Sequence, residues 1–343
     1  MTDLIVTNQG AAGRATLNRP KALNAITHQM LLDLETAIQG WATDDNIKLA
    51  LVDAVGDRAF CAGGDIVDLY AEGIKGRDEM ARTFWRDEYR INAAIESYAK
   101  PYIAIMDGIV MGGGVGISAH GSHRIVTERT MFAMPECAIG IIPDVGGSLL
   151  LARMPGHCGE YAGLTGARLS GADCIYAGLA DFYVESDQLE NLKAALCETG
   201  DPETIRQFAS VPPASDLELN IDEINALFNG NSVANIQTAL QNATSDFAKS
   251  AAKGLSRGAP LGVMSALKTI HTARVDNDMA LALRNEYRFV TNAVASGEFI
   301  EGVRAAVIDK DRNPSWKYPT LDSVPVELID ALDHPALNGD FIA

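Results

Sequence analysis

The chain has 343 residues, of which 47% are hydrophobic and 21% are charged, a composition typical of folded globular proteins rather than disordered ones. Its formal net charge of −17 argues against nucleic acid or an anionic membrane surface as the main partner. An anionic ligand would therefore need a local site made of basic side chains or backbone N–H groups.

Two short β-rich segments open the chain. They cover residues 4–7 and 13–20, and their spacing predicts a β-hairpin. Thr27 has the side chain of a helix N-cap, and the apolar residues after it recur at helical spacing, which predicts a helix over 28–41. The side chains predicted to share one face of this helix are Met30, Leu31, Leu34, Ala37, Ile38 and Trp41.

Three more β-rich runs follow, at 48–55, 102–108 and 123–134. The first two lead into Gly-rich turns and then helical sequence, which is the pattern of parallel β and α units. The stretch 101–119 is nearly long enough to cross a membrane, but Asp107 and five closely spaced glycines favour a buried strand and a turn. The first half of the chain is therefore predicted to be α/β.

The two Gly-rich turns are FCAGGD (60–65) and MGGGVG (111–116). Glycine lets a ligand approach the main chain closely, and a helix beginning after the second turn would add partial positive charge. Two such turns, each aiming one N–H group at the same point, are what an oxyanion hole for an ester or thioester carbonyl requires. The alternative is that both glycine clusters serve only tight turns and packing.

A third segment, 131–147, places Glu136 and Asp144 eight positions apart among apolar, small and turn-forming residues. Buried carboxylates are costly unless they are paired, hydrogen-bonded or used in chemistry. The simpler interpretation puts Glu136 in the first turn of a short helix after Pro135, and lets Asp144 start a turn after Pro143. The functional interpretation gives both carboxylates a role beside the proposed oxyanion hole.

From about residue 186 onward the pattern is helical. Breaks are expected near 211–214 and 254–262, and amphipathic stretches cover 263–273 and 278–296. The five cysteines are odd in number and form no CxxC pair, so we expect buried thiols in a reducing compartment rather than disulfides or zinc ligands. The first residues lack the pattern of a signal peptide, so the expected location is cytoplasmic.

Three other chemistries are weaker interpretations. Gly114-x-Gly116-x-x-Ala119 matches a dinucleotide-binding fingerprint, but the helix available before Gly121 is short and the FCAGGD turn stays unexplained. A serine hydrolase is disfavoured because Gly116-Ile117-Ser118-Ala119 is followed by His120, where a nucleophile elbow G-x-S-x-G has its second glycine. No metal is expected, because the only closely spaced histidines, His120 and His123, have no carboxylate in a metal-ligand pattern.

Taken together, four motifs resemble one known family. NRPKALNAI (18–26), FCAGGDI (60–66), MGGGVG (111–116) and MPECAIGIIPDVGG (134–147) are similar to the enoyl-CoA hydratase/isomerase, or crotonase, superfamily. Segments 164–184 and 298–316 resemble its 3-hydroxyisobutyryl-CoA hydrolase branch, whereas 190–260 match nothing specific. The resemblance implies an α/β fold with a crotonase-like ββα spiral core that binds acyl-CoA over residues 1–185. It implies a helical C-terminal region over 186–343 that completes the active site and the assembly surface.

Residue roles follow from the resemblance. It implies that the N–H groups of Gly64 and Gly113 bind the thioester carbonyl. Glu136 matches the carboxylate that acts on the thioester, and Asp144 matches an acid near the substrate 3-hydroxyl. Glu88 matches a further substrate contact, although by sequence alone it fits a solvated helix charge equally well. The residues implied to line the CoA pocket, largely through their backbone, are Lys21, Ala22, Leu23, Gly63, Asp65 and Ile66.

One departure from the hydratases decides the expected reaction. The resemblance implies that hydratases share Glu136 but carry a second glutamate where this chain has Gly116, and typically glycine where it has Asp144. Hydration then lacks a required group, whereas hydrolysis keeps the oxyanion hole and a positioned carboxylate. We therefore expect hydrolysis of a short 3-hydroxyacyl-CoA, 3-hydroxyisobutyryl-CoA first, in valine degradation, with no cofactor beyond the CoA of the substrate.

Several alternatives stay open at this stage. A hydratase or isomerase of the same fold, or a non-catalytic protein that binds acyl-CoA or a nucleotide, would use the same glycines. Glu136 could attack the thioester directly or activate water as a general base, and the lack of a second carboxylate at Gly116 favours direct attack. The expected partner is an acyl-CoA substrate, with no nucleic acid and no membrane, and with a trimer or hexamer as possible homo-oligomers.

Overall fold

The computed structural model describes residues 2–330, 332, 334 and 341. These residues form two compact units, each assembled from three stretches of the chain. The first unit contains residues up to 64, then 90–132 and 168–219, and the second contains 65–89, 133–167 and the described residues from 220 onward. The boundary expected at residue 186 stays a prediction. No helix in the described part of the chain combines the length and apolar character that a membrane span needs.

A seven-stranded, mostly parallel sheet forms the centre of the first unit. Its strands run in the order β1-β2-β3-β5-β7-β10-β11, with antiparallel pairs only at the two ends. This confirms the predicted hairpin and the predicted parallel β and α units. The strands are β1 (Leu4–Gln9), β2 (Ala12–Leu17), β3 (Leu49–Ala54), β5 (Tyr102–Met106), β7 (His123–Val126), β10 (Phe182–Val184) and β11 (Ala209–Ser210).

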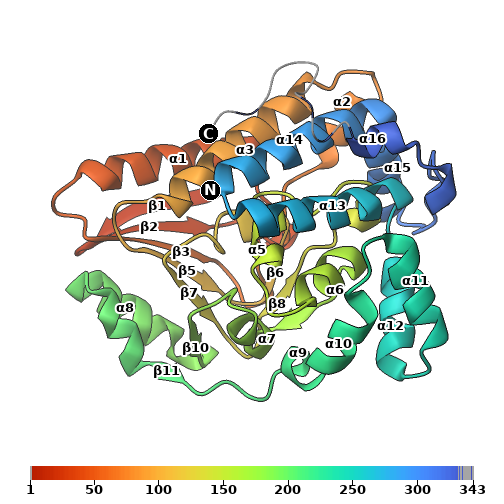
Figure 1. The fold of residues 1–343 in the computed structure, drawn as a ribbon. Helices are drawn as coiled ribbons and strands as arrows, with labels where there is room; N and C mark the ends of the chain where they lie inside the picture. Colours follow the sequence, from red (N-terminus) through yellow and green to blue (C-terminus); the bar gives the residue numbers. More distant parts are fainter. Residues whose placement is uncertain (1, 331, 333, 335–340, 342–343) are drawn as a thin grey trace. The chain divides into compact units, whose positions relative to one another are not determined.

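Helices cover both faces of this sheet, as its continuous apolar strands require (Figure 1). Helix α1 (His28–Thr43) is capped by Thr27 and buries the six apolar side chains predicted for it. Its Trp41 packs on β2 at Gly13, where a Cβ would lie only 2.2 Å from the indole ring. Helix α8 (Leu189–Thr199) packs on the opposite face through leucines that contact β2, β3, β5 and β7.

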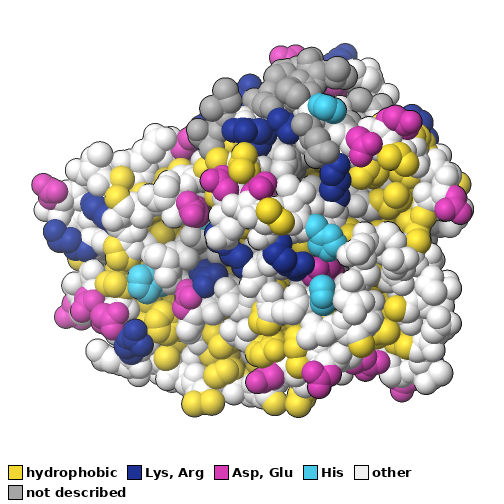
Figure 2. Space-filling model, viewed as in Figure 1, with side chains coloured by type: hydrophobic (Ala, Val, Ile, Leu, Met, Phe, Trp, Pro, Cys, Tyr) yellow, Lys and Arg dark blue, Asp and Glu magenta, His cyan; other side chains and the backbone are white. Residues whose placement is uncertain are grey.

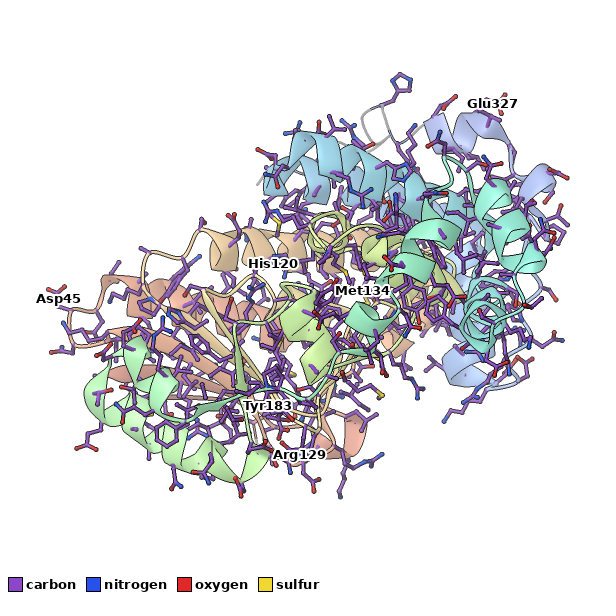
Figure 3. All side chains as sticks on the ribbon, turned by 60° about the horizontal axis from the view of Figure 1, so that its bottom comes forward. Asp45, His120, Arg129, Met134, Tyr183 and Glu327 are labelled. Atoms are coloured by element: carbon purple, nitrogen blue, oxygen red, sulfur yellow. The ribbon has the colours of Figure 1, made fainter. Side chains whose placement is uncertain are left out.

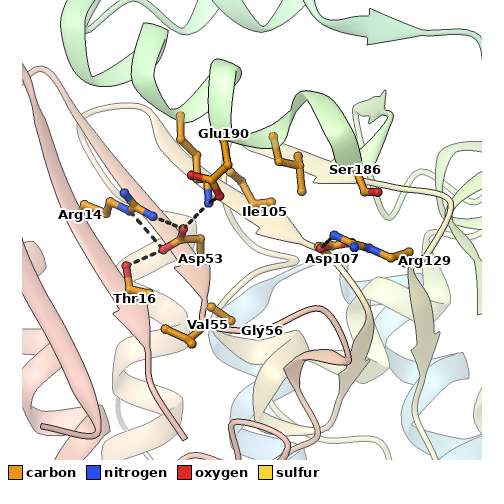
Figure 4. Close-up of a pocket in the computed structure, with 13 residues that line it drawn as sticks. Arg14, Thr16, Asp53, Val55, Gly56, Ile105, Asp107, Arg129, Ser186 and Glu190 are labelled. Carbon is orange, nitrogen blue, oxygen red and sulfur yellow. Dashed lines mark hydrogen bonds and ion pairs between the residues drawn. The ribbon is translucent and has the colours of Figure 1, made fainter. Parts of the chain in front are cut away.

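A charged network ties α8 to the sheet (Figure 4). Asp53 of β3 is buried and accepts hydrogen bonds from Arg14 Nη2 at 2.6 Å, Thr16 Oγ1 at 2.6 Å and Lys193 Nζ at 3.2 Å. Because side chains alternate along a strand, Arg14 and Thr16 of β2 share the face that carries α8. These groups border a pocket of about 250 Å³, in which Arg129 also pairs with Asp107.

A second, smaller sheet carries the two Gly-rich turns. Its order is β4-β6-β8-β9, from β4 (Ala59–Cys61), β6 (Ile109–Met111), β8 (Met131–Ala133) and β9 (Leu169–Ser170). The predicted strand over 123–134 is divided between the two sheets, because Thr127 and Thr130 close a turn through main-chain and side-chain hydrogen bonds. Strands of three residues are too short for a period-2 pattern to reveal them.

Short helices complete the first unit. They are η1 (Pro20–Ala22), α4 (Gly113–Gly116), α7 (Gly171–Tyr176), η3 (Ser186–Gln188), η4 (Pro202–Gln207) and α9 (Asp216–Leu219). Helix α3 (Glu79–Glu96) contributes its last seven residues to this unit and its first eleven to the other.

The second unit is helical, as predicted for the later part of the chain. The predicted amphipathic stretches are α13 (Pro260–Asp276) and α14 (Met279–Ser296), which pack against each other. The other helices are α2 (Val67–Gly73), η2 (Glu136–Ile139), α5 (Gly147–Ala152), α6 (Cys158–Thr165), α10 (Ile221–Phe228), α11 (Val233–Asn242), α12 (Asp246–Leu255), α15 (Glu298–Val303), η5 (Arg304–Ile308), η6 (Leu321–Ser323) and α16 (Val326–Asp330).

All five cysteines are free thiols, and four of them are buried. On the face shown in Figure 2, acidic and basic side chains are interspersed rather than gathered into one large patch of a single sign.

Candidate active site

The two Gly-rich turns lie side by side in the first unit. A Cβ on Gly63 would lie 3.5 Å from the carbonyl oxygen of Met111, and a Cβ on Gly114 would lie 2.5 Å from that of Cys61. Gly63 has a φ of +112°, which favours glycine, and Gly114 needs glycine because the main chains approach so closely. The structure thus brings together the FCAGGD and MGGGVG turns that the sequence analysis singled out.

Gly113 is the first residue of helix α4 and is buried. The N–H groups at the start of a helix have no acceptor within that helix, so the Gly113 N–H is a donor that the helix itself does not use. Helix α4 has four residues, which agrees with the short helix expected from the sequence and is too short for the crossover helix of a dinucleotide-binding fold.

The predicted CoA-contacting segment lies along the FCAGGD turn. The Ala62 N–H donates to the Leu23 carbonyl at 3.1 Å, and the Ile26 N–H donates to that of Gly63 at 2.9 Å. Lys21 and Ala22 are exposed on the preceding helix η1. The structure therefore brings Lys21, Ala22, Leu23, Gly63 and Gly64 together, whereas Asp65 and Ile66 begin the second unit at the start of α2.

Sequence reasoning missed Asn24, which fixes this segment. Its buried side chain donates to the carbonyls of Val55 at 3.1 Å and Ala59 at 2.8 Å, and accepts from the Arg19 N–H at 2.8 Å. Asn24 also has a φ of +54°, a conformation that asparagine tolerates better than most residues. The motif NRPKALNAI contains this residue, so a buried asparagine at a turn was the available signal.

Glu136 is the first residue of the short helix η2 in the second unit. This is the position that the simpler sequence interpretation gave it, but that interpretation does not explain its surroundings. Its side chain is 4% exposed, and Oε2 finds no hydrogen-bond partner in the described part of the chain. Burial raises the pKa of Glu136 well above its ordinary value, and the charges of Asp144, Glu88 and Glu286 raise it further.

Asp144 follows Pro143 and begins a turn closed by the Gly147 N–H, which donates to the Asp144 carbonyl at 2.7 Å. Its carboxyl is buried, and Oδ2 accepts from the hydroxyl of Tyr89 at 2.7 Å. Burial raises the pKa of Asp144 to about 6, while the hydrogen bond from Tyr89 opposes that rise. Tyr89 is a residue that sequence reasoning missed, although it directly follows Glu88.

Glu88 of helix α3 is 2% exposed, so the interpretation of it as a solvated helix charge is wrong. Its Oε1 has no hydrogen-bond partner among the described residues. Burial raises the pKa of Glu88 well above its ordinary value, and the charge of Asp144 adds to the rise. Glu88, Glu136 and Asp144 therefore form one buried cluster of carboxyl groups.

A fourth carboxyl group joins this cluster from helix α14. Oε2 of Glu286 accepts from the Gly146 N–H at 2.7 Å, and Oε1 accepts from the Ser148 N–H at 2.9 Å and from the Ser148 hydroxyl. Burial raises the pKa of Glu286 to about 8. No signal in the sequence pointed to Glu286, because it lies about 140 residues from its partners in an amphipathic helix.

The segment that carries Glu136 and Asp144 is held at both ends. Met134, labelled in Figure 3, is buried, and its Cε would lie 2.5 Å from a Cβ at Gly147. Met134 and Gly147 therefore pack against each other and close the segment into a compact loop. In contrast, none of the predicted site residues lines the pocket of Figure 4, whose charged groups pair with one another.

Comparisons with known proteins agree on one family. The enoyl-CoA hydratase/isomerase model matches residues 12–332. Mitochondrial 3-hydroxyisobutyryl-CoA hydrolase from Gallus gallus is 38% identical over 98% of this chain and 90% of its own length. The corresponding Homo sapiens protein is 37% identical over 95% of this chain and 86% of its own length.

Two similar solved structures carry other names. An enoyl-CoA hydratase from Rhodobacter sphaeroides superposes with a TM-score of 0.94 at 40% identity, covering all of both chains. A carnitinyl-CoA dehydratase from Mycobacterium thermoresistibile has the same TM-score and identity, covering 99% of this chain and 98% of its own.

Proposed function

Because this chain belongs to the enoyl-CoA hydratase/isomerase, or crotonase, family, we propose that it hydrolyses a short 3-hydroxyacyl-CoA thioester. The preferred substrate is 3-hydroxyisobutyryl-CoA, which yields 3-hydroxyisobutyrate and CoA. The observation that carries this proposal is the set of curated relatives of that name, at 37–39% identity over nearly the whole chain. The pathway proposed with this substrate is valine degradation.

Asp144 supports hydrolysis over hydration. A buried acid with a hydrogen-bond donor on one oxygen keeps its other oxygen for a substrate hydroxyl, which a 3-hydroxyacyl group has and an unsaturated acyl group lacks. Gly116, inside helix α4, provides no second carboxylate to hold a water for addition to a double bond. Hydration or isomerisation remains the second candidate, favoured by the names of the two similar solved structures.

In the proposed reaction the N–H groups of Gly64 and Gly113 bind the thioester carbonyl oxygen, and the charge that develops there in the transition state strengthens both hydrogen bonds. Asp144 contacts the 3-hydroxyl, and Glu88 makes a further contact with the substrate. Lys21, Ala22, Leu23, Gly63, Asp65 and Ile66 contact CoA largely through the main chain. No cofactor takes part besides the CoA that the substrate carries.

Glu136 is the proposed nucleophile. Its ionised carboxylate attacks the carbonyl carbon, the C=O electron pair moves to the oxygen, and collapse of the adduct breaks the C–S bond. The CoA thiolate leaves. Water then adds to the mixed anhydride and breaks its C–O bond, which releases the acid and restores the Glu136 carboxylate, and one proton of that water neutralises the thiolate. A buried carboxylate without a hydrogen bond on one oxygen is a stronger nucleophile than a solvated one, which supports this route.

Multiple turnovers in ¹⁸O-labelled water distinguish the two roles of Glu136. Cleavage of an anhydride at the glutamyl carbonyl leaves label in the peptide that contains Glu136, and mass spectrometry detects it. Label found only in the released acid would exclude the covalent route with cleavage at the glutamyl carbonyl. Attack by water on the substrate carbonyl, with Glu136 as general base, would then be the better interpretation.

A panel of short acyl-CoA thioesters tests the function itself. Thiol release, followed with a chromogenic disulfide, should be fastest for 3-hydroxyisobutyryl-CoA and next for 3-hydroxypropionyl-CoA. Crotonyl-CoA, followed by loss of its conjugated absorbance, should be unchanged. Consumption of crotonyl-CoA without thiol release from any thioester would instead establish the hydratase. Glu136→Ala and Asp144→Ala variants with every activity unchanged would point to a binding protein.

Location and assembly complete the proposal. We propose a cytoplasmic protein, whereas the animal relatives carry mitochondrial in their names. A trimer or hexamer is the proposed assembly, and the mass from light scattering decides between these and a monomer.

A further inference from the structure

Glu286 is a buried carboxyl group that the proposed reaction does not use. Its side chain is fully buried on helix α14, and it accepts three hydrogen bonds from two residues just beyond Asp144. A buried carboxyl group with such partners costs free energy that an apolar side chain would avoid. The presence of Glu286 therefore needs an explanation, and the loop that it binds provides one.

The loop that Glu286 holds has an unusual backbone. Val145 and Gly146 have φ values of +55° and +77°, and a β-branched residue in this left-handed region is strained by about 1 kcal/mol or more. Such a conformation persists only where surrounding contacts enforce it. The Gly146 and Ser148 N–H groups both point at Glu286, so its two oxygens fix the main chain on both sides of Gly147.

The loop in turn sets the position of Asp144. The left-handed residue follows Asp144 directly, and the Asp144 carboxyl meets the Tyr89 hydroxyl at 2.7 Å. A change in the main-chain angles of Val145 and Gly146 would move the adjacent Asp144 carboxyl away from this partner. Accuracy at the level of about 1 Å matters for a group that orients a substrate.

We propose that Glu286 is a positioning residue for the reaction: its carboxyl group fixes the 144–148 loop so that Asp144 is presented to the substrate hydroxyl. This inference rests on the proposed function, because it assigns Asp144 that hydroxyl. Glu286 itself touches no reacting atom.

When Glu286 is ionised, its charge also interacts with the other acids of the cluster. Asp144, Glu136 and Tyr89 are the titratable groups that interact with it, and their mutual repulsion contributes to the raised pKa of Glu286 and Glu136. Below about pH 8 Glu286 is mostly protonated, so a neutral side chain in its place removes a hydrogen-bond acceptor and not a charge. A comparison at pH 7 therefore measures positioning and not repulsion.

The test compares Glu286→Gln with Glu298→Gln, a control that removes another buried carboxyl group of the second unit, on helix α15. Glutamine keeps one acceptor oxygen but replaces the other with NH₂, so one loop N–H loses its acceptor. We expect kcat for 3-hydroxyisobutyryl-CoA to fall about 10- to 100-fold in Glu286→Gln, with KM within about threefold of wild type. The control should change neither value.

Hydrogen exchange gives a second measure, independent of activity. The peptide that contains residues 144–148 should lose protection in Glu286→Gln but keep it in Glu298→Gln. A Glu286→Gln variant with wild-type kcat and wild-type hydrogen exchange would overturn the positioning role while leaving the proposed function intact. A wild-type protein without thiol release would overturn the proposed function, and the role of Glu286 in it as well.

Discussion

Replacement of Tyr89 by phenylalanine isolates one hydrogen bond in the carboxyl cluster. The Tyr89 hydroxyl donates to Asp144 at 2.7 Å, and its ring packs edge-on against Tyr287 at a centroid distance of 6.1 Å, a contact that phenylalanine keeps. The hydroxyl stabilises the ionised carboxylate, so its removal raises the pKa of Asp144 above its present value of about 6.

The size of the shift follows from the strength of such a bond. A hydrogen bond to a charged group contributes about 1.5–3 kcal/mol, and about 1.4 kcal/mol corresponds to one pKa unit. The pKa of Asp144 should therefore rise by about 1 to 2 units. At pH 7 the ionised fraction of Asp144 then falls from about nine-tenths to between about a half and a tenth.

Carboxyl infrared difference spectra over a pH titration measure this directly, with Asp144→Asn to assign the band. Thiol release should fall about two- to tenfold at pH 7 in Tyr89→Phe and recover towards wild type near pH 9. An Asp144 band that titrates at the wild-type pH, or at a lower one, would refute the assignment of Tyr89 as the donor that keeps Asp144 ionised.

Three further predictions concern the rest of the chain. Gly113→Pro deletes one proposed oxyanion-hole donor and should lower kcat by about two to three orders of magnitude. Gly113→Ala keeps the N–H group, so its kcat should fall far less. Equal kcat values for the two variants would contradict the proposed role of Gly113. Asp53→Ala leaves Arg14 and Lys193 without the carboxylate that they share, and it should lower the free energy of unfolding, measured in urea, by about 3 kcal/mol. Lys249→Met, which breaks an exposed ion pair, should lower it by less than about 0.5 kcal/mol. The pKa of Glu136 is higher in the folded than in the unfolded state, so the folded state binds more protons. The contribution of Glu136 to stability is therefore lost as the pH rises above about 4.3. Glu136→Gln should accordingly stabilise the protein more at pH 8 than at pH 5, and an equal effect at both would contradict the raised pKa.

Local signals in the sequence predicted most of the first unit. The apolar face of the helix beginning at His28 and the β-rich runs at 48–55 and 102–108 follow from periodicity, which depends only on neighbouring residues. The division of 123–134 between two sheets does not follow from periodicity, because it depends on which distant strand each half of the segment pairs with. Local pattern carries no information on such pairings.

The same limit explains which parts of the carboxyl cluster were missed. Glu136 and Asp144 were recognisable because they sit in one short segment whose composition makes a charge conspicuous. Tyr89 and Glu286 lie in amphipathic helices, where a polar residue is ordinary, and only the packing of α3 and α14 shows that they face buried acids. Glu88 shows the ambiguity most clearly, since its neighbours in sequence are charged and yet its side chain is buried.

Membership of this family does not determine which reaction a protein catalyses, so the reaction has to be inferred from individual residues. Relatives at 37–40% identity carry the names hydrolase, hydratase and dehydratase, although two of them share this fold with a TM-score of 0.94. The glycine turns and Glu136 suit any reaction that polarises a thioester carbonyl. We propose that the position of the second acid distinguishes these reactions. The candidate in this chain is Asp144, which is buried, interacts with Glu88 and accepts a hydrogen bond from Tyr89, whereas position 116 is a glycine. If Asp144 binds the substrate hydroxyl as proposed, the loop that follows Pro143 sets the substrate preference of this family member.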